Sequence, residues 1–184
     1  ELRKRKIATT VIVTAQHRQM LDQMLAVFSL VPDHDLSVMQ ENQDLFHVTS
    51  AVLERIKPVL VAEKPDVLLV QGDTTTAFVG ALAGFYSRTK VAHIEAGLRS
   101  FDKHSPFPEE INRLLTDQLS DFLFVTEPSA IRNLKREGLD KKKVYYAGNV
   151  MIDTLFKFRK KIQGSDILNR LGLKDPAIKY ALLT

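Results

Sequence analysis

The sequence has no cysteine, and it has only 8 glycines and 7 prolines among its 184 residues. Without cysteine, a disulfide scaffold and a thiolate site for zinc or an iron–sulfur cluster are both excluded. The low glycine and proline content excludes a collagen-like chain, and a 45% share of hydrophobic residues excludes disorder. Because disulfides are rare in the reducing cytoplasm, the absence of cysteine favours a cytoplasmic protein.

Long apolar runs are also missing. The longest, residues 77–86, includes two glycines and is half as long as the stretch of about 20 residues that a membrane-spanning helix needs. The net charge of +4 comes from two basic segments, residues 1–6 and 131–161, and neither carries a nucleic-acid-binding motif. We therefore expect no membrane and no nucleic acid among the partners.

The length of 184 residues fits one domain with a short addition. We predict a domain over residues 1–164 and interpret residues 165–184 as a linker and the start of a second, truncated domain. The reason is an apolar segment at 180–184, typical of a strand, which ends the sequence with no helix after it. The sequence also begins without methionine, so we expect a fragment of a longer protein.

Short apolar segments alternate with segments of helical periodicity along the chain. The pattern predicts strands at 9–14, 66–71, 90–95, 122–126 and 144–147, and helices at 18–30, 45–60, 77–87, 108–120, 128–137 and 150–161. It also predicts a loop at 33–37 and a bend or break at Pro58. Strands that are apolar throughout and are each followed by a helix indicate a parallel sheet covered on both faces. The predicted fold class is therefore α/β, with a doubly wound, Rossmann-like sheet.

Polar residues follow these strands at their carboxyl ends, where open α/β sheets bind ligands. In the first group, Gly72 permits a sharp turn, and Asp73 and Thr74 stand at the start of a helix, where amide groups favour an anion. This turn could hold a phosphate or a sugar. Equally, Asp73 or Thr74 could simply cap the helix.

Two further acids are expected at the same edge of the sheet. Glu95 lies where packing would require an apolar residue, which favours a functional carboxylate. Glu109 fits ordinary helix-start sequence, and Glu110 is spaced to pair with Arg113. Asp73, Glu95 and Glu109, called the three acids below, offer the proton donors and acceptors that acid–base chemistry on a sugar requires.

Other sites are less well supported by the sequence. His17 and His93 lack metal-ligand spacing, and His93 lies within a predicted strand, so a core or hydrogen-bonding role is favoured. We predict no metal. The glycine fingerprint of dinucleotide-binding folds, the P-loop and the hydrolase nucleophile elbow are all absent, which excludes those classes.

Six motifs in a fixed order point to a known family. They are Thr-Ala-Gln-His-Arg (14–18), Gly-Asp-Thr-Thr-Thr (72–76), His-Ile-Glu-Ala-Gly-Leu-Arg (93–99), Ser-Pro-Phe-Pro-Glu-Glu (105–110), Asn-Arg-Leu-Leu-Thr-Asp (112–117) and Gly-Asn-Val-Met-Ile-Asp (148–153). Through them the chain resembles the non-hydrolysing UDP-N-acetylglucosamine 2-epimerases of bacteria and archaea. The resemblance covers essentially all 184 residues but only about half of such an enzyme.

The resemblance implies one half of a two-domain enzyme similar to the GT-B glycosyltransferases. It implies a cofactor-free, reversible interconversion of UDP-GlcNAc and UDP-ManNAc, through elimination and re-addition of UDP, that supplies cell-surface polysaccharide precursors. By motif position, Asp73, Glu95 and Glu109 match the family's catalytic carboxylates, and which is base and which is acid stays open. Asp73, Glu95 and Arg113 are expected to bind the substrate.

The resemblance also implies partners and missing parts. A second UDP-GlcNAc is expected to bind as an activator near Gln16, His17 and Gln19, and the enzyme is expected to be a homodimer. The family's opening strand and its Gly-Thr-Arg-Pro-Glu turn have no counterpart before Glu1, and its second domain has none after Thr184. We therefore expect residues 1–184 alone to be inactive.

Two alternatives remain open from the sequence. The chain could belong to a sugar-nucleotide binding module or a GT-B-type glycosyltransferase without epimerase chemistry. It could also belong to a hydrolysing 2-epimerase, which releases free ManNAc and UDP.

Overall fold

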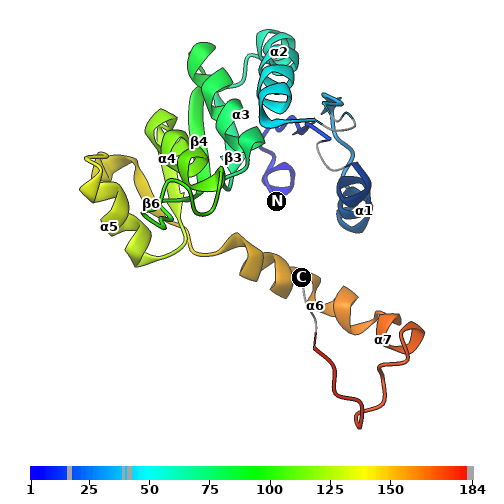
Figure 1. Ribbon diagram of the computed structural model, residues 1–184. Coiled ribbons are helices and arrows are strands. Elements are labelled where there is room, and N and C mark those ends of the chain that lie inside the picture. The colour runs from blue at the N-terminus through cyan, green and yellow to red at the C-terminus, as the bar shows by residue number, and fades with distance from the viewer. Residues whose placement is uncertain (16–17, 39, 41–42, 182–184) are drawn as a thin grey trace. The chain divides into compact units, whose positions relative to one another are not determined.

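The computed structural model describes residues 1–15, 18–38, 40 and 43–181 (Figure 1). The chain divides into two compact units, Glu1–Gly148 and Asn149–Thr184, called unit 1 and unit 2. Each unit is described by itself. The domain boundary at residue 164 stays a prediction.

Unit 1 alternates strands and helices. Its first half contains the 3₁₀-helix η1 (Arg3–Arg5), β1 (Ile12–Val13), α1 (Arg18–Phe28), β2 (His34–Asp35), α2 (Leu45–Glu63), β3 (Val67–Gln71) and α3 (Thr75–Tyr86). Its second half contains β4 (Lys90–Ala96), α4 (Glu109–Leu119), β5 (Phe122–Val125), α5 (Pro128–Arg136), the 3₁₀-helix η2 (Lys141–Lys143) and β6 (Val144–Tyr146). The predicted alternation is confirmed.

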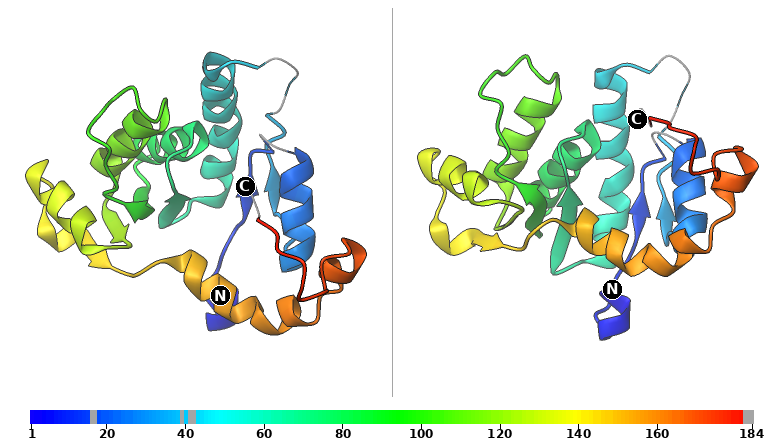
Figure 2. Two further views of the ribbon diagram at one scale, coloured as in Figure 1. Left: turned by 60° about the horizontal axis from the view of Figure 1, so that its bottom comes forward. Right: turned by 90° about the horizontal axis from the view of Figure 1, so that it is seen from below.

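The strands form two parallel sheets. The larger has the order β3-β4-β5-β6, and β1 pairs with β2 in a separate two-stranded sheet (Figure 2). In the larger sheet Val70 stands opposite His93, and His93 stands opposite Leu123. These three side chains therefore share one face of the sheet. The α/β class with parallel sheets is confirmed.

Helices α3, α4 and α5 all pack on that face. In α3, a methyl group on Gly84 would come within 2.7 Å of Val91, so the helix lies against the sheet at this point. In α5, Ala130 and Leu134 join the buried cluster beneath β5. On the opposite face Leu69 is 47% exposed.

The sequence predicts helices on both faces of the sheet. Within unit 1, helices α3, α4 and α5 cover one face of the larger sheet. The physical reason is the strand order. From β3 to β6, each strand is added at the same edge of the growing sheet. Right-handed crossovers that all progress across the sheet in one direction put their helices on one face.

The predicted loop at 33–37 is wrong in part, and the alternative of a break at Pro58 is wrong. The predicted loop at 33–37 contains β2, because the backbone amides of His34 and Leu36 donate to carbonyl groups of Val11 and Val13. Helix α2 also continues through Pro58 to Glu63. Pro58 is exposed, so the hydrogen bond it lacks is lost on the solvent side, while the buried face of α2 packs against α3 on both sides of it.

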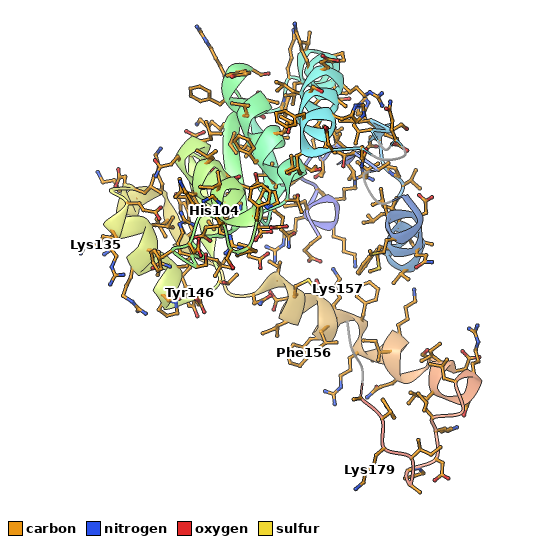
Figure 3. All side chains as sticks on the ribbon, in the orientation of Figure 1. His104, Lys135, Tyr146, Phe156, Lys157 and Lys179 are labelled. Atoms are coloured by element: carbon orange, nitrogen blue, oxygen red, sulfur yellow. The ribbon has the colours of Figure 1, made fainter. Side chains whose placement is uncertain are left out.

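Unit 2 contains α6 (Val150–Gln163) and α7 (Ile167–Arg170). Helix α6 begins at Asn149, whose side-chain oxygen accepts a hydrogen bond from the Met151 amide at 2.8 Å. Large apolar side chains of α6 are exposed, among them Phe156 at 66% (Figure 3). The predicted strand at 180–184 lies mostly outside the described residues. No described helix is long and apolar enough to cross a membrane.

Candidate active site

The turn after β3 presents Asp73. Gly72 adopts a φ of 74°, in the left-handed region that glycine tolerates, and its amide donates to the Ile94 carbonyl at 3.0 Å. Thr74, and not Asp73, caps α3 by accepting a hydrogen bond from the Ala77 amide at 3.2 Å. Asp73 instead accepts a hydrogen bond from Arg113 at 2.5 Å. The capping alternative therefore applies to Thr74 and leaves the Asp73 carboxylate available.

Glu95 lies in a β-bulge at the carboxyl end of β4. Ile94 pairs with Phe124 and Ala96 pairs with Val125, so Glu95 is the extra residue between them. Its φ of 74° is a conformation that residues other than glycine rarely adopt. Such strain often marks a functional residue whose side chain is aimed in an unusual direction.

The bulge puts the Glu95 carboxylate beside the Asp73 turn. A methyl group placed on Gly72 would lie 3.8 Å from Glu95 Oε2. The Glu95 side chain is half-buried, and it accepts no hydrogen bond from the described residues. Two of the three acids are therefore neighbours at the carboxyl edge of the sheet.

Helix α4 brings the third acid to this edge. Glu109 is its first residue, and Arg113, one turn further on, reaches Asp73. Residues four apart share one face of a helix, so Glu109 and Arg113 lie on the same side of α4. The predicted pair of Glu110 with Arg113 is confirmed at 3.3 Å. The structure thus pairs Arg113 with Asp73, places Glu95 beside the turn that carries Asp73, and puts Glu109 one turn from Arg113.

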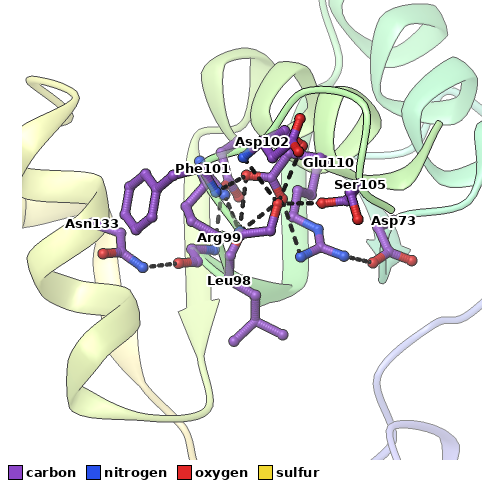
Figure 4. A network of polar contacts seen from close by, with 12 residues as sticks. Asp73, Leu98, Arg99, Phe101, Asp102, Ser105, Glu110 and Asn133 are labelled. Atoms are coloured by element: carbon purple, nitrogen blue, oxygen red, sulfur yellow. Dashed lines mark hydrogen bonds and ion pairs between the residues drawn. The ribbon is translucent and has the colours of Figure 1, made fainter. Parts of the chain in front are cut away.

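Glu110 has a structural role that the sequence did not reveal. Glu110 is 3% exposed, and its carboxylate accepts hydrogen bonds from the amides of Ser100 and Phe101 at 2.9–3.0 Å (Figure 4). Helix α4 thereby holds the loop that follows β4. The neighbouring Glu109 is left outside this network.

A buried ionic network lies beneath the three acids. Asp117 of α4 accepts hydrogen bonds from His93, from the Gly97 amide and from Arg99 at 2.6, 3.0 and 2.7 Å. Arg99 also forms two 2.7 Å hydrogen bonds with Glu137. Burial acts to lower the pKa of Arg99, but the bonds to Glu137 and the charge of Asp117 outweigh it and raise the pKa. The predicted hydrogen-bonding role of His93 is confirmed.

Gly97 is essential to this packing. Its φ is 81°, and a methyl group there would lie 2.8 Å from the Ala130 carbonyl oxygen. Its own carbonyl accepts a hydrogen bond from Asn133 at 3.0 Å (Figure 4). In the sequence, Gly97 stood out only as part of the motif at 93–99, and Asp117 and Glu137 had no signal besides their charge and, for Asp117, its place in the motif at 112–117.

Some predicted residues lie elsewhere. Gln16 and His17 are outside the described residues, as is the side chain of Gln19. A cavity of about 840 Å³ lies between α2 and α3, and its lining includes Lys64 and Arg88. Both residues precede strands, so this cavity is at the amino edge of the sheet, opposite the three acids. Within the described ranges, no three His, Asp or Glu side chains gather as a metal site.

The geometry suits proton transfer at one edge. Arg113 balances the charge of Asp73, while the carboxylates of Glu95 and Glu109 have no hydrogen-bond partner among the described residues. Acid–base catalysis needs one group to accept a proton and another to donate one, and the carboxylates at this edge supply both.

Comparison with known proteins adds the family. The family model for UDP-N-acetylglucosamine 2-epimerase matches residues 1–184. The chain is 49% identical over 179 residues to the UDP-N-acetylglucosamine 2-epimerase of Escherichia coli K12, covering 95% of this chain and 48% of that relative. It is 46% identical over 183 residues to a protein described as a putative UDP-N-acetylglucosamine 2-epimerase of Thermotoga maritima, covering 98% and 48%. The chain therefore spans about half the length of these relatives.

Solved structures agree with this match. The UDP-GlcNAc 2-epimerase of Neisseria meningitidis bound to UDP-GlcNAc superimposes with a TM-score of 0.86 at 42% identity, covering 94% of this chain and 47% of that one. The Methanocaldococcus jannaschii UDP-GlcNAc 2-epimerase in complex with UDP-GlcNAc and UDP also gives 0.86, at 36% identity, covering 92% and 47%. The fold of this chain therefore recurs in about half of each of these proteins.

Proposed function

The chain belongs to the UDP-N-acetylglucosamine 2-epimerase family, and from this membership we propose that it forms the acid-bearing half of an enzyme that interconverts UDP-GlcNAc and UDP-ManNAc. One observation carries the proposal. Asp73 and Glu95 lie at the carboxyl edge of adjacent strands, with the Glu95 carboxylate beside Gly72, and Arg113 joins Asp73 to the helix that begins with Glu109. Relatives of this fold are solved with UDP-GlcNAc bound, which supports the choice of substrate.

The proposed reaction begins with loss of a proton. A carboxylate removes the proton on C2 while the C1–O bond to UDP breaks, and its electron pair leaves with the phosphate oxygen. A C1=C2 double bond forms, giving a glycal, UDP and a protonated carboxyl group. A carboxyl group then returns a proton to the opposite face of C2 as the phosphate oxygen attacks C1. The product is the sugar nucleotide inverted at C2.

The chain's residues have separate parts in this proposal. Asp73, Glu95 and Glu109 carry the protons. Arg113 holds the Asp73 carboxylate in one orientation and helps bind the substrate. No cofactor is required, because the proton and the leaving group both return.

The remaining parts of the proposal rest on the family resemblance. They are a cytoplasmic homodimer, a supply of polysaccharide precursors and a second UDP-GlcNAc bound as activator near Gln16, His17 and Gln19. Because the chain spans about half the length of its relatives, activity should be assayed in a hybrid chain. In this hybrid chain, the sequence replaces the matching segment of the Escherichia coli K12 relative.

The test is solvent exchange at C2. In D₂O, the hybrid chain should incorporate deuterium at C2 of UDP-GlcNAc, and Asp73→Asn or Glu95→Gln should lower the rate about 10²- to 10⁴-fold. The matched controls are Asp66→Asn and Glu54→Gln, which change exposed acids near the amino edge of the same sheet and should leave the rate unchanged.

Each other outcome has a meaning. Tight UDP-GlcNAc binding without exchange would replace the proposal with a binding module, and free ManNAc among the products would replace it with a hydrolysing enzyme. Near-normal rates for both Asp73→Asn and Glu95→Gln would remove the three acids from the mechanism.

A further inference from the structure

His93 is fully buried in β4, and both of its ring nitrogens have partners. Nδ1 lies 2.6 Å from Asp117 Oδ1, and Nε2 lies 2.8 Å from the Gly72 carbonyl oxygen. A carbonyl oxygen can only accept a hydrogen bond, so Nε2 carries a hydrogen and donates it. The tautomer at this nitrogen is therefore determined by its partner.

The second nitrogen also donates. The other carboxylate oxygen of Asp117 already accepts hydrogen bonds from the Gly97 amide and from Arg99, so the carboxylate acts as an acceptor in this network. A carboxylate only accepts hydrogen bonds, so we assign the hydrogen between the two groups to Nδ1. His93 thus faces its two partners with two ring N–H groups, as an imidazolium.

The charges of the network then cancel. His93 and Arg99 are positive and Asp117 and Glu137 are negative, so no net charge is buried. Burial of ionic groups is tolerated when they are paired and their hydrogen bonds are satisfied. The cancellation supports the assignment of two hydrogens to the ring.

The ring joins the elements that carry the three acids. Gly72 immediately precedes Asp73, and its amide and carbonyl are both bound to β4, through Ile94 and His93. Glu95 follows His93 by two residues along β4. Asp117 belongs to α4, the helix that begins with Glu109, and it also binds Gly97 on the far side of the bulge.

We propose that His93 is a positioning residue whose two ring N–H groups tie the Asp73 turn to Asp117 of α4 and so set the spacing between Asp73 and Glu95. This inference rests on the proposed function, because the spacing matters to a reaction only if the acids act together. His93 does not touch the substrate in this proposal.

Two substitutions separate the two hydrogen bonds. The amide nitrogen of His93→Asn takes the place of Nδ1, so it keeps the donor to Asp117 and loses the one to Gly72. The longer side chain of His93→Gln puts an amide nitrogen near the place of Nε2, so it keeps the donor to Gly72 and leaves Asp117 without its partner. Stability and rate should therefore respond differently to the two changes.

The variant with the larger loss of kcat should be the more stable of the two. In the hybrid chain, His93→Asn should lower kcat for C2 exchange about 10²-fold with little change in KM, since small misplacements of reacting groups cost about this much. His93→Gln should stay within about tenfold of the parent kcat, although it should be the less stable variant in urea, because Asp117 loses a partner. If kcat losses instead follow the stability losses, His93 is merely structural and the proposal is wrong.

A second measurement is independent of activity. In the 184-residue chain, a ¹H–¹⁵N NMR spectrum should show two ring N–H signals for His93, and His104, which is exposed, serves as the control with rapid solvent exchange. A single ring N–H signal from His93 would overturn the proposal that both ring nitrogens donate hydrogen bonds. If the parent hybrid chain shows no exchange at C2 while both signals are present, the proposed function fails. The two hydrogen bonds donated by His93 would still stand.

Discussion

Helices α2 and α4 both border α3, yet they bury opposite kinds of side chain. The buried residues of α2 are all apolar: Val48, Ala51, Val52, Ile56, Val59 and Leu60. Those of α4 are all polar: Glu110, Asn112, Thr116 and Asp117. In α4 it is Ile111 and Leu115 that are exposed, each at 37%.

The difference shows how each helix is fixed. An apolar interface is held by packing, which tolerates changes of shape. The polar interface of α4 depends on hydrogen bonds to specific partners: Thr116 donates to the Asn112 carbonyl at 2.6 Å, and Asp117 accepts from three donors. Such an interface specifies one arrangement, and it is α4 that carries Glu109 and contacts Asp73 through Arg113.

Asp117→Ala should have the largest effect on this comparison. It leaves His93 and Arg99 as buried charges without their shared partner, which should lower the free energy of unfolding by about 3–5 kcal/mol. Urea unfolding of the 184-residue chain measures the change, with Asp66→Ala, at an exposed position, as the control within about 0.5 kcal/mol. A loss near that of the control would mean that the polar interface is no more demanding than the surface.

Ile56→Val should have a smaller effect. It removes one methylene group from the apolar interface of α2, which should cost about 0.5–1.5 kcal/mol in the same urea experiment. The two ring N–H signals of His93 should not move, since the network beneath α4 does not contact this side chain. Loss of those signals would show that the two interfaces are coupled.

Glu63→Gln should have the smallest effect, a loss of stability near neutral pH that disappears in acid. Hydrogen bonds from His34 and Thr10 hold the pKa of Glu63, at the end of α2, below its ordinary value. The carboxylate therefore stabilises the fold above its ordinary pKa, and this contribution is lost as the pH falls through the lowered value. The unfolding free energy of the variant should vary less than that of the parent between about pH 5 and pH 3.

The Glu63 effect should also shrink at high salt, because the pair is exposed to solvent. Parallel pH curves for parent and variant would contradict the prediction. Either result sharpens the comparison, since it shows whether α2 has any polar contact comparable to those of α4.

The sequence was sufficient for the alternation of strands and helices and for the edge where the acids lie. Both follow from periodicity and from the rule that strands of a parallel sheet end on one side. The Glu95 bulge could not be predicted, because a bulge arises only when two strands are paired, and the residues of β4 read as one regular strand. The same holds for β2, which is two residues long and depends on its pairing with β1.

The inverted packing of α4 was equally hidden. Apolar periodicity would turn Ile111 and Leu115 inward, but the buried charges of Asp117 and Glu110 are satisfied only by groups distant in the chain, the His93 ring and the Ser100 amide. Pairing across such distances leaves no local signal. A charged residue in a helix is therefore a poor guide to its exposed face.

The left-handed backbone at Glu95 favours glycine for stability, whereas the proposed reaction requires a carboxylate at the same position. Glycine would adopt this conformation without the cost of about 1–2 kcal/mol that any side chain incurs there, and it would remove the carboxylate. A population of variants selected for folding alone would drift toward glycine at this position, whereas one selected for turnover would retain glutamate. Position 95 can therefore report which of the two pressures has acted on a lineage.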